Sequence, residues 1–184
     1  VGVDKKNKTV FAQAGALMDD IMIALENEGL GFTSIPAPGA ITIAGALAIN
    51  GHGAAIPAKG EDTTDRIYGS LSNRIVSMKA IVFDETTKKY AIKTFDRSNP
   101  TAKALLTSLG RVFVTSVVLR AEPNTNLRCV STVKVTTDEL FAKPGSKGRT
   151  FASYVEKTGR VEAILFPFTD RPWLKYWSVE PKKH

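Results

Sequence analysis

One histidine, His52, lies between Gly51 and Gly53 in a stretch of small residues that runs from Pro36 to Pro57. Imidazole is largely neutral at pH 7, can act as a nucleophile and exchanges protons in the same pH range. Glycine neighbours remove the side chains that would hold a flat ligand away from the backbone, and they permit dihedral angles closed to other residues. The pattern therefore predicts a cofactor-binding loop in which His52 is the reactive group.

The alternative interpretation of His52 is structural, because a histidine in such a loop can simply occupy a tight turn. Motif matches need a structural context before they count as sites. The sequence has no Gly-Lys-Ser/Thr phosphate loop and no G-x-G-x-x-G that opens a helix, so it lacks the common nucleotide-binding motifs.

Two segments resemble the vanillyl-alcohol oxidase family, whose PCMH-type FAD-binding domain presents a histidine to the flavin in a GG-x-L-x-x-x-x-HG loop. The segments are Ala44-Gly45-Ala46-Leu47 with Asn50-Gly51-His52-Gly53, and Tyr68-Gly69-Ser70-Leu71-Ser72. Ala44 replaces the first glycine of the family's pair, which relaxes the closest backbone approach there. Within the family, LAINGHG and IPAKGED resemble the cholesterol oxidases with covalently attached flavin, and the resemblance continues to residues 173–178.

For the cofactor, the resemblance implies FAD bonded covalently to His52 through the 8α-methyl carbon of the isoalloxazine. Backbone amides of the Ala37-Pro38-Gly39 turn and of a loop from Ala44 to Leu47 are expected to bind phosphate and ribityl oxygens, since unencumbered amides form anion-binding nests. An ordinary core valine is the alternative for Val114, which the resemblance places near the adenine. The expected cofactor-binding residues are His52, Ala37, Pro38, Gly39, Ala44, Gly45, Ala46, Leu47, Asn50, Gly51, Gly53, Tyr68, Gly69, Ser70, Leu71, Gly110 and Val114.

For the reaction, the resemblance implies oxidation of a 3β-hydroxysteroid (cholesterol) to the 3-ketosteroid, with O2 reduced to H2O2 and the ring double bond isomerised. A sugar-lactone or polyol oxidase of the same family, and a flavin-binding or structural piece without turnover, stay open as alternatives. The resemblance places the catalytic base and a charge-stabilising arginine outside this chain, so no catalytic residue is assigned. Glu61, Asp62 and Asp65 follow the loop closely, but an acidic loop is more often solvated surface.

Length and charge limit the other functions of this chain. It has 184 residues and a formal net charge of +7. It begins at Val1, and enzymes of the resembled family are much longer, so we expect a piece whose site is completed by the missing remainder of the same protein. Lysines and arginines are scattered rather than arranged in a stripe with aromatics, which argues against nucleic acid. The basic charge suits contact with an anionic membrane surface.

The sequence contains little information about redox chemistry and localisation. Cys129 is the single cysteine and has no Cys or His partner at metal-ligand spacing, so no metal site is predicted. We expect Cys129 to be a small buried strand residue. The resemblance implies a secreted bacterial enzyme, although the residues themselves do not determine localisation.

The hydrophobic pattern predicts an α+β fold. Residues 1–123 are expected to form the second lobe of a PCMH-type FAD-binding domain, and residues 124–184 the beginning of a substrate-binding domain, with a turn near residue 124 between them. Helices are predicted at 16–28, 100–109, 138–142 and 151–157. Strands are predicted at 10–14, 75–83, 89–95, 112–119, 130–135, 161–166 and 173–179, with the second and third forming a hairpin.

The strand at 173–179 carries aromatic candidates for a sterol cavity, Trp173, Tyr176 and Trp177. Rigid aromatic rings bury much apolar area at a small entropic cost. Neighbouring residues of a strand point to opposite faces, so Tyr176 and Trp177 cannot both face one cavity. We expect at least one of the two to pack within the sheet.

Overall fold

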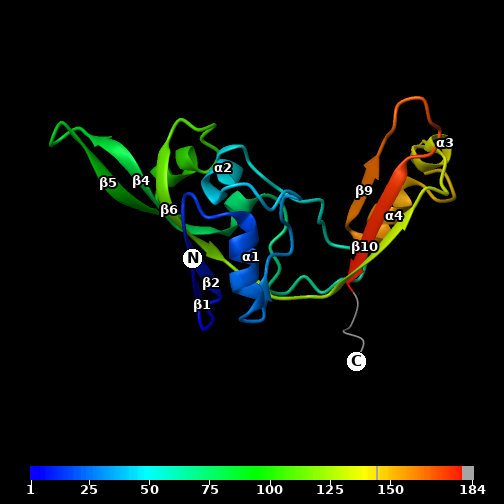
Figure 1. Ribbon diagram of the computed structural model, residues 1–184, viewed down its shortest axis with the longest axis horizontal. Helices are drawn as coiled ribbons and strands as arrows, with labels where there is room; N and C mark the ends of the chain where they lie inside the picture. Colours follow the sequence, from blue (N-terminus) through cyan, green and yellow to red (C-terminus); the bar gives the residue numbers. More distant parts are fainter. Residues whose placement is uncertain (144, 180–184) are drawn as a thin grey trace. The chain divides into compact units, whose positions relative to one another are not determined.

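The computed structural model describes residues 1–143 and 145–179, and the chain divides into two compact units (Figure 1). The first unit comprises residues 1–53 and 65–124, and the second comprises residues 54–64 and 125–184. The elements of the first unit are β1 (Gly2–Asp4), β2 (Thr9–Gln13), α1 (Met18–Glu26), β3 (Leu30–Gly31), α2 (Ile43–Ala48), the 3-10 helix η1 (Leu71–Arg74), β4 (Ile75–Asp84), β5 (Lys89–Asp96), the 3-10 helix η2 (Pro100–Leu105), β6 (Phe113–Arg120) and β7 (Glu122–Pro123). The elements of the second unit are β8 (Leu127–Thr132), α3 (Thr137–Leu140), α4 (Phe151–Thr158), β9 (Val161–Ile164) and β10 (Trp173–Val179).

The first unit is built on an antiparallel five-stranded sheet with the order β1-β2-β6-β4-β5, and β3 pairs separately with β7. Alternate residues of the central strands are buried, because successive side chains of a strand point to opposite faces. Helices α1 and α2 contribute their apolar sides to the same core. This core contains Val10, Ala12, Ile21, Leu25, Ile43, Leu47, Met78, Ala80, Val117 and Leu119.

The second unit contains the antiparallel sheet β8-β10-β9, with β10 in the centre. Helix α4 packs on one face of the sheet, where Leu174 is fully buried and Tyr176 packs against the same cluster. Thr150 caps the helix by accepting a hydrogen bond from the Ser153 amide, and Gly159 ends it in the left-handed conformation, which glycine adopts without a side-chain penalty.

Residues 54–64 belong to the second unit although the chain on both sides of them belongs to the first. The Ile56 amide donates to the Gly159 carbonyl at 2.8 Å, and the Lys59 amide donates to the Glu156 carbonyl at 2.9 Å. Arg160 donates from Nη2 to Glu61 Oε1 at 2.7 Å and from Nη1 to Glu61 Oε2 at 3.0 Å. The Arg160 and Glu61 side chains are only 7% and 11% exposed, so a buried ion pair fastens this segment beside the end of α4.

Most predicted elements are present in the structure, including the β4–β5 hairpin and β10. The helix predicted at 100–109 is the 3-10 helix η2, which Asn99 caps by accepting from the Thr101 amide and which ends at Leu105. Leu109 lies beyond this helix, 74% exposed and with φ +52°, so the predicted helical end at residue 109 was wrong. The strand predicted at 130–135 lies earlier, at Leu127–Thr132. No helix of the described residues is long and apolar enough to cross a lipid bilayer.

Cys129 corrects a second expectation, because its side chain is exposed rather than buried. It lies on β8, an edge strand, and pairs with Trp177 of β10. Paired residues share a face of the sheet, and Leu174 and Tyr176 occupy the other face together with α4. Cys129 is therefore exposed because it lies on the face that α4 does not cover.

Gly159 provides a stability prediction. A Cβ atom at this position would lie 2.1 Å from the Ile56 carbonyl oxygen, and φ is +66°. Gly159→Ala should lower the free energy of unfolding by about 2–4 kcal/mol, since a backbone clash adds to left-handed strain. Gly60→Ala is the matched control, because Gly60 has φ +79° and open space at its Cβ position. Equal losses for the two variants in urea unfolding would contradict the clash.

Candidate functional site

His52 lies on an exposed loop that follows α2. It forms an antiparallel bridge with Ser70, and the Leu71 amide donates to the Gly51 carbonyl at 2.9 Å. The structure therefore brings together two of the segments singled out from the sequence, residues 50–53 and 68–71. The imidazole is not turned into the protein interior, and it is accessible to a ligand.

Gly51 and Gly53 are needed because the loop packs closely on the chain's own backbone. A Cβ atom on Gly53 would lie 2.3 Å from the Ile35 carbonyl oxygen, and one on Gly51 would lie 2.8 Å from the Ala46 carbonyl oxygen. Distances this short force the backbone to move. The sequence interpretation that these glycines make room for a ligand misses this first function, which is to let the loop sit against residues 35 and 46.

The imidazole of His52 has one hydrogen-bond partner within its own loop. Its Nδ1 atom lies 3.1 Å from the Gly53 carbonyl oxygen. A carbonyl oxygen only accepts, so in this contact Nδ1 carries the proton and the other ring nitrogen of a neutral imidazole keeps its lone pair. In the neutral tautomer that makes this contact, Nε2 is the unprotonated nitrogen, and the ring is exposed at the surface of the first unit.

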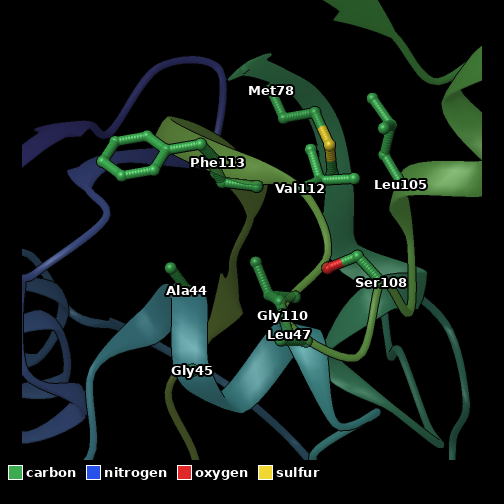
Figure 2. Close-up of a pocket in the computed structure, with 11 residues that line it drawn as sticks. Ala44, Gly45, Leu47, Met78, Leu105, Ser108, Gly110, Val112 and Phe113 are labelled. Carbon is green, nitrogen blue, oxygen red and sulfur yellow. The ribbon is translucent and has the colours of Figure 1, made fainter. Parts of the chain in front are cut away.

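A pocket of about 220 Å³ lies between α2 and the segment that leads from η2 into β6. Its lining contains Ala44, Gly45 and Leu47 from α2, together with Gly110 and Val114. These five residues come from two predicted cofactor-binding segments that are far apart in the sequence. Figure 2 shows α2 with Ala44 and Gly45 below the pocket, and Met78, Val112 and Phe113 above it.

The pocket is connected to the His52 loop through α2. The Leu109 amide donates to the Ala48 carbonyl at 2.9 Å, which fastens the segment after η2 to the end of α2. Two residues beyond that end, Asn50 adopts φ +60°, and the Gly51 amide turns back to the Ala46 carbonyl at 2.7 Å. His52 does not line this pocket. The side chains of α2 thus line the pocket, whereas the exposed imidazole lies on the loop that follows this helix.

The predicted role of the amides near Ala44 requires correction. Residues 44–47 form part of α2 rather than a loop, and their N–H groups are already used. The Ala44 amide donates to the Ala14 carbonyl at 3.1 Å, and the Gly45 amide donates to Thr42 Oγ1 at 3.2 Å. A ligand here therefore meets the small side chains of α2 rather than an open amide nest. Residues 37–39 form a separate exposed bend and do not line the pocket.

Six further residues line the pocket that sequence reasoning did not single out. They are Ala48, Met78, Leu105, Ser108, Val112 and Phe113. Only Ser108 offers a side-chain hydroxyl among them, and it is 91% buried, with 9% exposed. Gly110 is the one signal in the sequence that could have indicated this side of the pocket. Leu109 and Gly110 have positive φ values of +52° and +75°, and they form a turn in which the Leu109 amide contacts the end of α2. The remaining residues are apolar and could not be distinguished from core by type alone.

The aromatic residues of β10 separate as the strand periodicity predicts. Tyr176 packs on Tyr154 of α4, with ring centroids 4.9 Å apart, and burial raises the pKa of the Tyr154 hydroxyl. Trp173, Lys175 and Trp177 share the opposite face. The Lys175 ammonium lies 4.9 Å from the Trp173 ring centroid and 5.6 Å from that of Trp177, within cation–π range.

That face, which we call the tryptophan face, also has a polar side. Trp173 Nε1 donates to Ser131 Oγ at 2.6 Å, and Lys175 pairs with Glu162 at 3.0 Å. Trp173 is 38% exposed, and no helix covers this side of the sheet among the described residues. The face therefore offers two indole rings held in fixed orientations by their neighbours.

The acidic residues after the loop differ from the expectation of solvated surface. Glu61 is part of the buried pair with Arg160, and Asp65 pairs with Lys8 at 2.8 Å while remaining exposed. Asp62 is exposed, and its Oδ1 atom accepts from the Thr64 amide at 2.9 Å. The prediction was therefore wrong for Glu61, whose burial depends on an arginine 99 positions later in the chain. No group of three His, Cys, Asp or Glu side chains gathers at metal-binding geometry in the described part of the chain.

Comparisons with known proteins show which proteins this chain is similar to. Residues 126–184 match the family described as "Cholesterol oxidase, substrate-binding". A solvent-stable cholesterol oxidase is 50% identical with a TM-score of 0.93, over 96% of this chain and 33% of that chain. The cholesterol oxidase of Brevibacterium sterolicum is 46% identical with a TM-score of 0.89, over 93% of this chain and 32% of that one. A comparison with curated protein sequences gave no match.

A more distant structure shows the fold alone. An alkyldihydroxyacetonephosphate synthase is 19% identical with a TM-score of 0.52, over 71% of this chain. The fold class is therefore the predicted α+β class, with antiparallel sheets and the fold of the cholesterol oxidases. The chain belongs to the cholesterol oxidase family. It spans about a third of the length of the cholesterol oxidase chains that it matches.

The packing of the His52 loop generates a prediction for Gly53. Gly53→Ala should lower the free energy of unfolding by about 1–3 kcal/mol and shift the NMR resonances of the His52 ring, because the new methyl group displaces the loop from Ile35. Gly15→Ala is the control, since its Cβ position is open and its φ is not positive, and its effect should stay within about 0.5 kcal/mol. Unchanged His52 resonances in Gly53→Ala would contradict the packing argument.

Proposed function

We propose that the protein containing this chain is an FAD-dependent cholesterol oxidase. It oxidises the 3β-hydroxyl group of a sterol to the ketone, reduces O2 to H2O2 and moves the ring double bond into conjugation. The observation that carries the proposal is the 50% identity to a cholesterol oxidase over 96% of the chain. The match of residues 126–184 to a cholesterol oxidase substrate-binding family supports the choice of substrate.

The first unit is the proposed flavin-binding part. The pocket beside α2 is lined by small or apolar side chains, Ala44, Gly45 and Val114 among them, which suits a flat aromatic ring better than a charged group. When bound, FAD supplies the hydride acceptor for alcohol oxidation and the site at which O2 is reduced. Residues 50–53 and 68–71 form the adjoining edge of the proposed site, with the imidazole exposed.

His52 is the proposed point of covalent attachment. When FAD is bound, a ring nitrogen of His52 would supply the lone pair for a bond to the 8α-methyl carbon, with loss of one methyl C–H bond and the imidazole N–H bond. O2 would accept the two hydrogens with their electrons and leave as H2O2. The bond requires a ring nitrogen with a free lone pair, which a neutral imidazole supplies.

The second unit is the proposed sterol-binding part. Its tryptophan face presents Trp173 and Trp177 on one side of the β8-β10-β9 sheet, and the Lys175 ammonium fixes the two rings. Indole rings contribute large apolar contact areas, which suits a rigid, apolar tetracyclic ligand. Tyr176 has no part in this face, because it packs against Tyr154. None of the described residues is assigned as the catalytic base.

Covalent attachment predicts a simple loss in a His52→Ala variant. After incubation of the full-length protein that contains this chain with FAD, and precipitation in acid, the wild-type polypeptide should keep a visible flavin band and a correspondingly raised intact mass, whereas His52→Ala should keep neither. His184→Ala is the matched control, because His184 is the other histidine of this sequence. Acid-stable flavin in the His52→Ala variant would assign the bond to another residue.

The choice of substrate is tested by peroxide release. Cholesterol should produce H2O2 in the full-length enzyme, whereas a sugar lactone or a polyol should produce at least about a hundredfold less, since an apolar cavity leaves added hydroxyl groups without partners. Trp177→Ala should raise KM for cholesterol, with Tyr176→Phe as the control on the opposite face. Faster turnover of the sugar lactone would replace the sterol by a hydrophilic alcohol as substrate.

A further inference from the structure

Arg74 and Glu122 form a buried ion pair in the first unit. Hydrogen bonds connect the segments that it holds to the His52 loop. Arg74 ends η1 and Glu122 begins β7, 48 residues later. The two side chains are only 1% and 2% exposed. The Arg74 guanidinium also stacks over the Phe32 ring at 4.5 Å, so the pair is enclosed by protein on several sides.

The Glu122 carboxylate holds two different backbone segments, one with each oxygen. Its Oε2 atom accepts from the Thr33 amide at 2.9 Å and from the Thr33 hydroxyl group. Its Oε1 atom accepts from the Ile67 amide at 2.9 Å and from Arg74 Nη1. Arg74 Nη2 completes the arrangement by donating to the Ile67 carbonyl at 2.7 Å. The ion pair therefore fixes both backbone polar groups of Ile67.

Both of these segments lead to the His52 loop. Next to Thr33, the Ser34 hydroxyl oxygen accepts from the Gly53 amide at 3.2 Å. Beyond Ile67, the chain turns at Gly69, with φ +84°, and reaches Leu71, whose amide donates to the Gly51 carbonyl. The residues immediately before and after His52 are thus each connected to one oxygen of the same carboxylate.

The burial of an ion pair carries a large desolvation free energy. Replacement of a buried ion pair by apolar residues of similar volume is often neutral or stabilising, because burial removes both charges from water. Burial accordingly lowers the pKa of the Arg74 guanidinium, and the Glu122 charge opposes that shift. What apolar residues cannot replace is the set of directed hydrogen bonds to Thr33 and Ile67.

We propose that Arg74 and Glu122 are positioning residues that hold the backbone on both sides of His52 in the geometry needed for attachment of the flavin. The proposal rests on the proposed function of His52. The pair touches neither the imidazole nor the proposed flavin pocket. It acts through Thr33-Ser34 on Gly53 and through residues 67–71 on Gly51.

The first test needs no cofactor. In the full chain without FAD, Glu122→Gln should increase amide hydrogen exchange at Gly53 and Leu71 by at least about tenfold, because the amide side chain has only one accepting oxygen. The Val117 amide in the centre of the sheet should keep its protection. Glu61→Gln breaks the comparable buried pair of the second unit, and it should leave exchange at Leu71 unchanged.

The second test separates positioning from stability. A double variant with Arg74→Met and Glu122→Met removes both charges together but leaves the Thr33 and Ile67 backbone groups without these partners. Urea unfolding should therefore show a loss of stability, and attachment is measured under conditions in which the variant remains folded. Acid-stable attachment of flavin to this variant should be at least about tenfold slower, since small misplacements of a reacting group are costly, while reversible FAD binding should change little.

Three outcomes decide the matter. Slow attachment in a double variant that is folded and still binds FAD reversibly supports the proposal. Attachment at the wild-type rate in a folded double variant, or unchanged exchange at Gly53 and Leu71 in Glu122→Gln, overturns it. Failure of the full-length wild-type protein to retain any acid-stable flavin would instead overturn the proposed function of His52 and would remove the basis for this proposal with it.

Discussion

The buried carboxylate of Glu122 is the interaction on which the geometry of the site depends. A charge removed from water must receive hydrogen bonds from the protein, and Glu122 receives them from Thr33, Ile67 and Arg74. Those donors lie on three separate segments of the chain. The hydrogen bonds to one carboxylate therefore bring the three segments together. Two of these segments continue to residues that hydrogen-bond the His52 loop, Ser34 to Gly53 and Leu71 to Gly51.

The loop itself is held by close backbone packing rather than by its side chains. Gly51 and Gly53 approach Ala46 and Ile35 at distances that no Cβ atom can share. Their amide and carbonyl groups are bonded to the surrounding protein, at Ala46, Ser34 and Leu71. The consequence is a rigid loop whose one large side chain, the imidazole, remains exposed. Exposure on a fixed backbone is the condition that a point of covalent attachment requires.

The second unit also contains a buried ion pair between an arginine and a glutamate. Its Arg160 and Glu61 form a buried pair that brings residues 54–64 to the end of α4, where Gly159 permits contact with the Ile56 carbonyl. In both units an arginine and a carboxylate join segments far apart in the sequence. Hydrophobic burial alone is not directional, so it would not specify which backbone groups of these irregular segments must meet.

Local patterns in the sequence predicted the elements and singled out His52 as the candidate reactive group. Strand alternation, the Asn99-Pro100 cap and the glycines around His52 are signals between neighbours, and the hairpin, β10 and the exposed imidazole follow from them. The α+β class also follows from these patterns. The tertiary structure decided what depends on partners distant in the chain: the burial of Glu61, the exposure of Cys129, the use of the Ala44 amide by Ala14, and the Arg74–Glu122 pair. A charged or small residue carries no local sign of the partner that will bury it, because that partner is supplied only when the chain folds.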